Sequence, residues 1–226
     1  MRALLQGLLD LVLPTVCCRC ERAVTGGDAL CSGCAGRLRH SPREPTPRGV
    51  ASCTAAVAYE GDAIEWMRRF KYPRPGLAGI DPAALCVLRS LAREAARAAA
   101  VAPQLVVPVP QYPKRLRSRG FNPAALLARS VAREFATPFD PVLLERVRDT
   151  ASQTGLTRTQ RRRNVRGAFR VRPGGVVPAR VALVDDVVTT GSTLAAAAQA
   201  LLRAGAKKVD AICVARTAGH GGEGPV

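Results

Sequence analysis

Aromatic residues are scarce in this chain of 226 residues, which contains only five Phe, three Tyr and one Trp. Proteins that bind single-stranded nucleic acid without sequence preference stack successive bases on aromatic side chains. The shortage argues against a surface built from such stacking platforms. We assign most of the phenylalanines to the hydrophobic core: Phe121, Phe135, Phe139 and Phe169.

Histidine and acidic residues are also few. The two histidines, His40 and His220, lie in a Pro-rich segment and a Gly-rich tail, so neither suggests an acid–base catalyst. The 17 acidic residues face 34 Lys and Arg, which leaves a formal net charge of +17. Such a field favours phosphorylated small molecules or polyanions as partners, although an Arg-rich surface also arises from solvation alone.

A long apolar run is missing as well. The first 14 residues, MRALLQGLLDLVLP, are too short to span a bilayer. Asp10 interrupts them and no small-residue cleavage site follows, which argues against a secretory signal peptide. Their leucines repeat at helical spacing, which favours an amphipathic helix that docks on the body of the protein. We therefore expect a cytoplasmic protein without a membrane span.

Cysteine, in contrast, is abundant. Four of the eight cysteines form two Cys-x-x-Cys pairs separated by ten residues: Cys17, Cys20, Cys31 and Cys34. Two such knuckles can place four thiolates in a tetrahedron, which predicts a structural zinc site. Disulfides are the alternative, but a reducing cytosol disfavours them. Cys18 lies inside the first knuckle and could replace a neighbour as ligand, whereas Cys53, Cys86 and Cys213 lie in apolar contexts and are expected to be buried.

A Pro-rich segment divides the chain. Residues 41–50 contain three prolines and are predicted to form a semi-rigid linker. We expect the amphipathic helix and the zinc module in residues 1–40, the main domain in residues 51–217, and a flexible tail in residues 218–226.

Strand-like and helical patterns alternate in the main domain. Strands are expected near residues 55–59, 104–109, 181–184 and 208–215, and helices near 62–70, 85–99, 123–135 and 192–204. This alternation predicts an α/β fold with a mainly parallel sheet covered on both faces. Ligands of such sheets bind beyond the carboxyl ends of the strands.

The most informative segment is residues 181–193, VALVDDVVTTGST. Its apolar residues predict a buried strand, with Asp185 and Asp186 where the strand ends, followed by a hydroxyl-rich turn that opens a helix. A helix N-terminus receives phosphate well, and Gly191 lets the backbone approach an anion. Two acids beside a phosphate make sense if they accept hydrogen bonds from a sugar, so the pattern indicates a ribose 5-phosphate. An ordinary capped strand–turn–helix would explain the hydroxyls but neither acid.

Two further segments are rich in basic residues. Residues 105–122, LVVPVPQYPKRLRSRGFN, predict a strand and then a basic loop before a helix that begins near Asn122. Arginine forks and the Gly120 backbone in that loop could bind a pyrophosphate, or the loop is only solvated. The polar stretch 148–169 is predicted to be an excursion from the core, either a loop that closes over a substrate or a disordered linker.

The segment 181–193 resembles the binding motif for phosphoribosyl pyrophosphate (PRPP) in type I phosphoribosyltransferases. In that family the acid pair holds the ribose hydroxyls and the following loop wraps the 5-phosphate. The resemblance implies the following PRPP-binding set here: Asp185, Asp186, Val187, Thr189, Thr190, Gly191, Ser192 and Thr193.

The chain as a whole resembles the ComF family of competence-associated, phosphoribosyltransferase-like proteins. The resemblance covers the cysteine knuckles and a series of blocks in order: Phe70-Lys71-Tyr72, PVP before RGFN, Gln153-x-x-Leu156, Arg161-x-x-Asn164, Gly167-Ala168-Phe169 and the PRPP loop. It implies that Lys71 and Arg119 face pyrophosphate and that Gln153, Arg161 and Asn164 lie in a flexible hood. Many relatives carry a further Cys-x-x-Cys pair where this chain has only Cys53.

The family resemblance implies a function. The chain would be a phosphoribosyltransferase that displaces pyrophosphate from PRPP with Mg²⁺, using Asp185, Asp186, Arg119 and Lys71, while an unknown acceptor brings the nucleophile. Zinc would be structural. The alternative is a non-catalytic protein of DNA uptake or repair that uses the PRPP site as a sensor and contacts single-stranded nucleic acid or a helicase-type partner.

Overall fold

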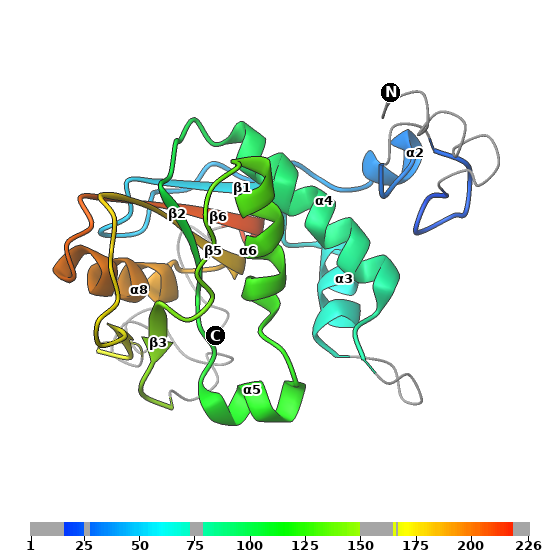
Figure 1. Cartoon of the computed structure of the whole chain (residues 1–226). Helices are drawn as coiled ribbons and strands as arrows, with labels where there is room; N and C mark the ends of the chain where they lie inside the picture. Colours follow the sequence, from blue (N-terminus) through cyan, green and yellow to red (C-terminus); the bar gives the residue numbers. More distant parts are fainter. Residues whose placement is uncertain (1–15, 25–27, 73–78, 150–164, 166, 219–226) are drawn as a thin grey trace, which may run out of the picture.

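The structure is a computed structural model that describes residues 16–24, 28–72, 79–149, 165 and 167–218 (Figure 1). The predicted N-terminal helix, the predicted hood residues Gln153, Arg161 and Asn164, and nearly all of the predicted tail lie outside these residues. No helix in the described ranges is long and apolar enough to cross a membrane.

A four-stranded parallel sheet lies at the centre of the main domain. Its strands run in the order β1 (Ser52–Ala58), β6 (Lys208–Arg216), β5 (Arg180–Val188) and β2 (Leu105–Pro108). Every neighbouring pair is parallel, so the carboxyl ends of all four strands meet at one edge. This arrangement confirms the predicted parallel α/β fold.

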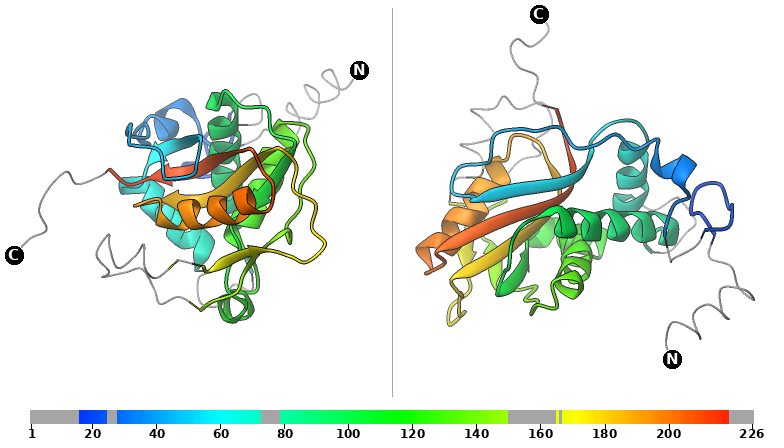
Figure 2. Two further views of the ribbon diagram at one scale, coloured as in Figure 1. Left: turned by 90° about the vertical axis from the view of Figure 1, so that its left-hand side faces the viewer. Right: turned by 90° about the horizontal axis from the view of Figure 1, so that it is seen from above.

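Helices cover both faces of this sheet (Figure 2). α4 (Pro82–Ala98) and α6 (Pro123–Glu134) lie on one face, and α8 (Ser192–Arg203) lies on the other. Because side chains alternate along a strand, Val184 of β5 packs toward α4 and α6, whereas Leu183 packs toward α8. Both side chains are fully buried, which explains the continuous apolar run in this strand.

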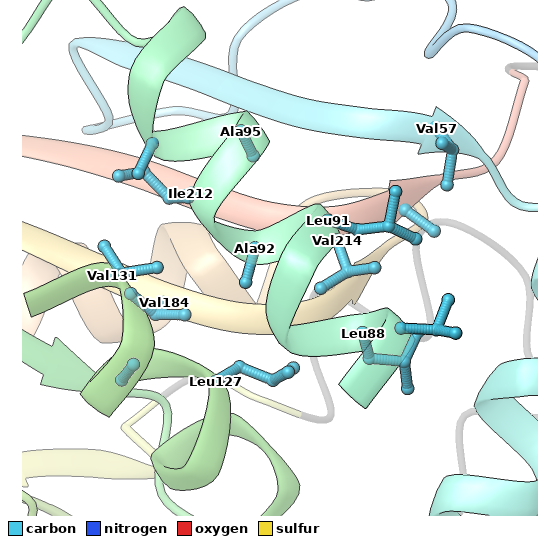
Figure 3. Packing of buried hydrophobic residues seen from close by; sticks show 14 of the residues in the cluster. Val57, Leu88, Leu91, Ala92, Ala95, Leu127, Val131, Val184, Ile212 and Val214 are labelled. Atoms are coloured by element: carbon cyan, nitrogen blue, oxygen red, sulfur yellow. The ribbon is translucent and has the colours of Figure 1, made fainter. Parts of the chain in front are cut away.

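The larger of the two buried clusters joins helix and strand side chains directly (Figure 3). The cluster contains Leu88 and Leu91 from α4, Leu127 from α6, Ile212 from β6 and Val184 from β5. Burying an aliphatic side chain of this size stabilises the fold by about 1.5–3 kcal/mol. The cluster therefore holds α4 and α6 firmly against the sheet whose edge carries the candidate site.

Several short elements were not predicted. α2 (Ser32–Ala35) follows the third cysteine, and α5 (Pro113–Arg119) replaces the predicted basic loop. α5 has no buried residue, so its sequence shows no apolar periodicity from which a helix could be predicted. Pro113 lies in its first turn, and Gly120 ends the helix in the left-handed region at φ 80°. β3 (Leu144–Arg146) and β4 (Phe169–Val171) form a separate antiparallel pair, so the predicted excursion ends in a strand at Phe169.

The cysteines outside the two knuckles differ from one another. Cys213 is buried in β6 and Cys53 is half-buried in β1, but Cys86 is exposed. The prediction that Cys86 is buried is therefore wrong. α4 is amphipathic, and its buried face carries Ala84, Val87 and Leu88 rather than Cys86.

Candidate functional site

A cavity of about 500 Å³ opens at the edge where the parallel strands end. α3 (Gly61–Lys71), α5 and the loop before α8 contribute to its wall together with β5. Its polar lining includes most of the predicted site residues and several others: Tyr59, Lys71, Tyr72, Gln111, Arg115, Arg119, Asn122, Arg146, Asp185, Asp186, Thr189, Ser192 and Thr193. Val187 and Gly191 also line it.

The two predicted acids lie inside β5 rather than after it. β6 pairs with β5 as far as Val188, so the prediction that the strand ends before the acids is wrong. Strand alternation directs Asp185 and Asp186 to opposite faces of the sheet. Asp186 is buried and forms an ion pair with Lys71, with 2.8 Å between Nζ of Lys71 and Oδ2 of Asp186. The Asp185 carboxylate accepts a hydrogen bond of 2.9 Å from the backbone N–H of Asp186.

These contacts set the charges at the site. Burial and then the neighbouring charge of Asp186 raise the pKa of Asp185 to about 7, against the opposing effects of the Asp186 backbone N–H and of Lys71. Burial alone would lower the pKa of Lys71, but the attraction and the hydrogen bond of Asp186 outweigh it, so this pKa is raised. Lys71 is therefore a cation at neutral pH, while Asp185 changes its protonation state there.

The loop before α8 has the features of an anion site. Gly191 occupies the N-cap of α8 in the left-handed region at φ 69°, and as a glycine it has no side chain to cap the helix. The hydroxyls of Thr190 and Ser192 are 2.8 Å apart, and the Thr190 hydroxyl accepts from the Ser192 N–H at 3.4 Å. The first turn of this 12-residue helix thus begins at the cavity wall, where its N–H groups and positive dipole end favour a phosphate.

Contacts between the Phe70-Lys71-Tyr72 block and the RGFN block fix the positions of Lys71 and Arg119. The rings of Phe70 and Phe121 lie 5.8 Å apart, and Phe70 is fully buried. On the cavity side, the Arg119 guanidinium lies 5.2 Å from the centre of the Tyr72 ring, a cation–π distance. Each basic residue is therefore adjacent to an aromatic contact that joins α3 to the end of α5.

The rest of the RGFN block has a structural role. The side-chain oxygen Oδ1 of Asn122 accepts from the Ala124 N–H at 3.1 Å and so caps α6. Its amide donates to the Val109 carbonyl at 3.1 Å, which ties the start of α6 to the end of β2. Gly120, which was considered for pyrophosphate contact, serves to end α5.

The sequence analysis missed Arg146 as a site residue. Arg146 ends β3, lines the cavity and lies over the Phe169 ring at 5.5 Å. Burial, followed by the nearby charge of Arg115, lowers its pKa, while Asp185 opposes this effect. Only its position directly before the Arg-rich stretch could have signalled it, because a three-residue strand leaves no periodic pattern. Tyr59 and Gln111 were not predicted either, because each follows a strand end without a recognisable motif.

The four predicted metal ligands come together in a second site. The sulfur atoms of Cys17, Cys20, Cys31 and Cys34 all lie within 4.8 Å of one another. Zn–S bonds of about 2.3 Å in a tetrahedron place sulfurs about 3.8 Å apart, so the cluster is close enough to bind a metal. Burial would raise the pKa of the Cys17 thiol, but backbone N–H groups at Cys31, Cys20 and Arg19 lower it to about 6. These N–H groups favour a thiolate, the form that binds zinc.

Cys18 does not belong to this cluster. It packs against the main core, and burial together with the neighbouring Cys86 raises its pKa to about 11. The suggestion that Cys18 replaces a neighbouring ligand is therefore not supported by its position.

Comparison with known proteins agrees with the fold. Residues 122–225 match the phosphoribosyl transferase domain family. The DNA utilization protein YhgH of Salmonella typhi is 43% identical over 115 residues, which cover 51% of this chain and 50% of that protein, so this match spans about half of the relative's length. YhgH of Escherichia coli K12 is 32% identical over 210 residues, covering 89% of this chain and 90% of that protein. Competence protein F of Haemophilus influenzae is 38% identical over 116 residues, 50% of this chain and 51% of that protein.

Proposed function

Because this chain belongs to the ComF family of competence-associated, phosphoribosyltransferase-like proteins, we propose that its cavity binds PRPP and transfers the ribose 5-phosphate to a nucleophilic acceptor. The observation that carries this proposal is that the acid pair of β5 and the N-terminus of α8 line the same cavity. A carboxylate pair can accept hydrogen bonds from vicinal hydroxyls, and a helix N-terminus can bind a phosphate. A ribose 5-phosphate carries both partners on one small molecule.

The charge of the cavity supports an anionic ligand. Four cationic side chains line it against the two acids: Lys71, Arg115, Arg119 and Arg146. Guanidinium groups match phosphate oxygens in geometry, so Arg119 and Arg146 suit the pyrophosphate of PRPP. Asp185 and Asp186 orient the sugar, and the ion pair with Lys71 fixes the position of the Asp186 carboxylate.

The proposed reaction breaks the bond between the anomeric carbon and a pyrophosphate oxygen. The bonding electrons leave with pyrophosphate, the acceptor's lone pair forms the new bond to that carbon, and the acceptor's proton passes to solvent. Side chains need only position the reactants and stabilise the charge that grows on the departing pyrophosphate. Arg119 and Lys71 lie in the same cavity as the acid pair, where they can serve this purpose.

Two metals enter the proposal. Carboxylate oxygens suit Mg²⁺, which prefers oxygen ligands and retains several waters, so Asp185 and Asp186 are compatible with a magnesium ion carried by the ligand. When bound, Mg²⁺ would neutralise part of the pyrophosphate charge. Zinc would be held by Cys17, Cys20, Cys31 and Cys34 and would stabilise the N-terminal module.

A second candidate function follows from the relatives' names and from the charge. Proteins named for DNA utilization and competence match this chain, whose formal net charge is +17. In this alternative the chain is a non-catalytic partner of DNA uptake or repair, and the PRPP site senses a nucleotide precursor. The acid pair and the adjacent anion loop favour the first candidate over a pure DNA adaptor, which needs neither.

The decisive experiment is calorimetric titration of PRPP and Mg²⁺ into the purified protein and into the Asp185→Asn/Asp186→Asn double variant. Glu134→Gln serves as the matched control, because Glu134 pairs with Arg97 and neither residue lines the cavity. We expect the wild type and the control to bind and the double variant to lose detectable affinity. Equal affinity in all three proteins, or no binding by the wild type, would contradict the proposed site.

Catalysis is tested separately by release of pyrophosphate from PRPP in the presence of a panel of amines and nitrogen heterocycles. Release that requires an acceptor and is lost in Arg119→Ala supports the transferase. Tight PRPP binding without release from any acceptor, combined with salt-dependent binding of an oligonucleotide, would favour the sensor instead.

A further inference from the structure

The cysteine module holds the start of the helix that ends at Lys71. Asp62 lies in the first turn of α3 and forms ion pairs with two arginines of the module. Arg19 lies within the first knuckle and forms an ion pair with the Asp62 carboxylate. Arg37, just after α2, donates from Nε to Oδ2 of the same carboxylate at 3.0 Å. The module and the helix are thereby joined through one side chain that is 20% exposed.

α3 connects this contact to the candidate site. Nine residues of helix separate Asp62 from Lys71, a rise of about 13.5 Å along a continuous α-helix. Trp66, Met67 and Phe70 bury one face of α3, so the helix behaves as a packed rod rather than a free segment. A shift at its first turn therefore moves the ammonium group that holds Asp186.

A second connection runs through the linker. The Ala58 N–H donates to the Arg39 carbonyl at 2.8 Å, so the chain leaving the module is held on the edge of the sheet. Further on, the ring of Pro47 packs directly on Gly191 of the phosphate loop. A Cβ atom placed on Gly191 would lie only 2.5 Å from Cγ of Pro47. A turn, closed by a hydrogen bond of 3.0 Å from the Val50 N–H to the Pro47 carbonyl, fixes that ring.

We propose that Arg19, Arg37 and Pro47 are positioning residues that couple the cysteine module to the PRPP site, so that metal binding and PRPP binding strengthen each other. This inference rests on the proposed PRPP binding. The module orders Lys71 through α3 and braces Gly191 through the linker, and both contacts lie in parts of the cavity assigned to PRPP. Because coupling of two binding equilibria is reciprocal, PRPP must stabilise the bound metal by the same factor by which the metal favours PRPP.

The test uses the zinc-loaded full chain with Arg19→Ala/Arg37→Ala and, separately, Pro47→Ala. These substitutions keep all four cysteines and every residue that lines the PRPP cavity. Arg97→Ala is the control, because its pair with Glu134 at 2.8 Å is a similar contact that does not involve α3 or the linker. Calorimetry should show a PRPP dissociation constant raised about threefold in Arg19→Ala/Arg37→Ala, since partly exposed ion pairs contribute modest energies, and a rise in the same direction in Pro47→Ala. Saturating PRPP should also slow the transfer of zinc to a chromogenic chelator in the wild type.

A second measurement separates this inference from the proposed function. Hydrogen exchange without PRPP monitors the Tyr72 N–H, bonded to the Arg68 carbonyl at 2.8 Å, and the Ala195 N–H, bonded to the Gly191 carbonyl at 2.9 Å. The first amide should exchange faster in Arg19→Ala/Arg37→Ala and the second in Pro47→Ala, while Arg97→Ala leaves both unchanged. Unchanged exchange in the test variants overturns the coupling even if PRPP binds. Faster exchange in the test variants, combined with a wild type that does not bind PRPP, would overturn the proposed function and leave the contact between the module and the cavity standing.

Discussion

The cysteine module and the main domain are stabilised in different ways. In the module the buried cluster consists of three cysteines, with Val24 and Leu30 packed against it. The main domain has two extensive apolar clusters, one on each face of its sheet. Because the described residues of the module bury so little apolar surface, we expect the module to depend on a bound metal, whereas the main domain is stabilised by hydrophobic burial. We therefore expect loss of the metal to destabilise the cysteine module, and a cavity in the apolar core to destabilise the main domain.

The largest effect is expected from Cys17→Ser. Structural zinc sites contribute apparent binding free energies of about 10–16 kcal/mol at neutral pH, and Cys17 is a fully buried member of its cluster. Metal analysis should find zinc in the wild type and almost none in the variant, while the main domain keeps its cooperative unfolding transition. Cys86→Ser is the control, since this exposed thiol lies outside the cluster. If the Cys17→Ser variant retained zinc, the assignment of Cys17 as a metal ligand would be contradicted.

A smaller effect is expected from Leu201→Ala in α8. Leu201 is fully buried in the cluster between α8 and the sheet, and such truncations cost about 2–5 kcal/mol of unfolding free energy. Chemical denaturation should show this loss, and the zinc content should stay at the wild-type value. Leu116→Ala provides the contrast, because Leu116 is 40% exposed on α5 and its removal should leave the unfolding free energy almost unchanged. Loss of zinc from Leu201→Ala would show that the two regions are not stabilised independently.

The smallest effect concerns the pH dependence of the main domain. Asp185 has a pKa raised from 3.8 to about 7 in the folded chain, so the folded state holds its proton more tightly than the unfolded state. The stabilisation is complete below about pH 4 and is lost as the pH rises through about 7. Between pH 6 and pH 8 this single group should lower the unfolding free energy by about 1 kcal/mol.

Denaturation of the wild type and of Asp185→Asn at both pH values measures this contribution as a difference. The variant should lack that part of the pH dependence, because its amide does not titrate. Parallel curves for the two proteins would mean that Asp185 is already ionised at pH 6.

Much of this protein could be predicted from local patterns. The apolar run of β5, the helix after Gly191 and the paired cysteines depend on residue types at short spacing, and all appear in the structure. Short elements escaped prediction because they bury little. α5 has no buried residue, and β3 and β4 comprise three residues each, so neither periodicity nor length identified them.

The sequence by itself determined the parallel α/β fold and the clustering of the four cysteines, because these follow from alternating patterns and short spacings along the chain. Only the tertiary structure decided that Lys71 pairs with Asp186, that Arg146 joins the cavity and that Pro47 braces Gly191. The members of each of these contacts are separated by tens to more than a hundred residues in the chain. Contacts of this kind arise from how helices and strands pack, which no local pattern encodes.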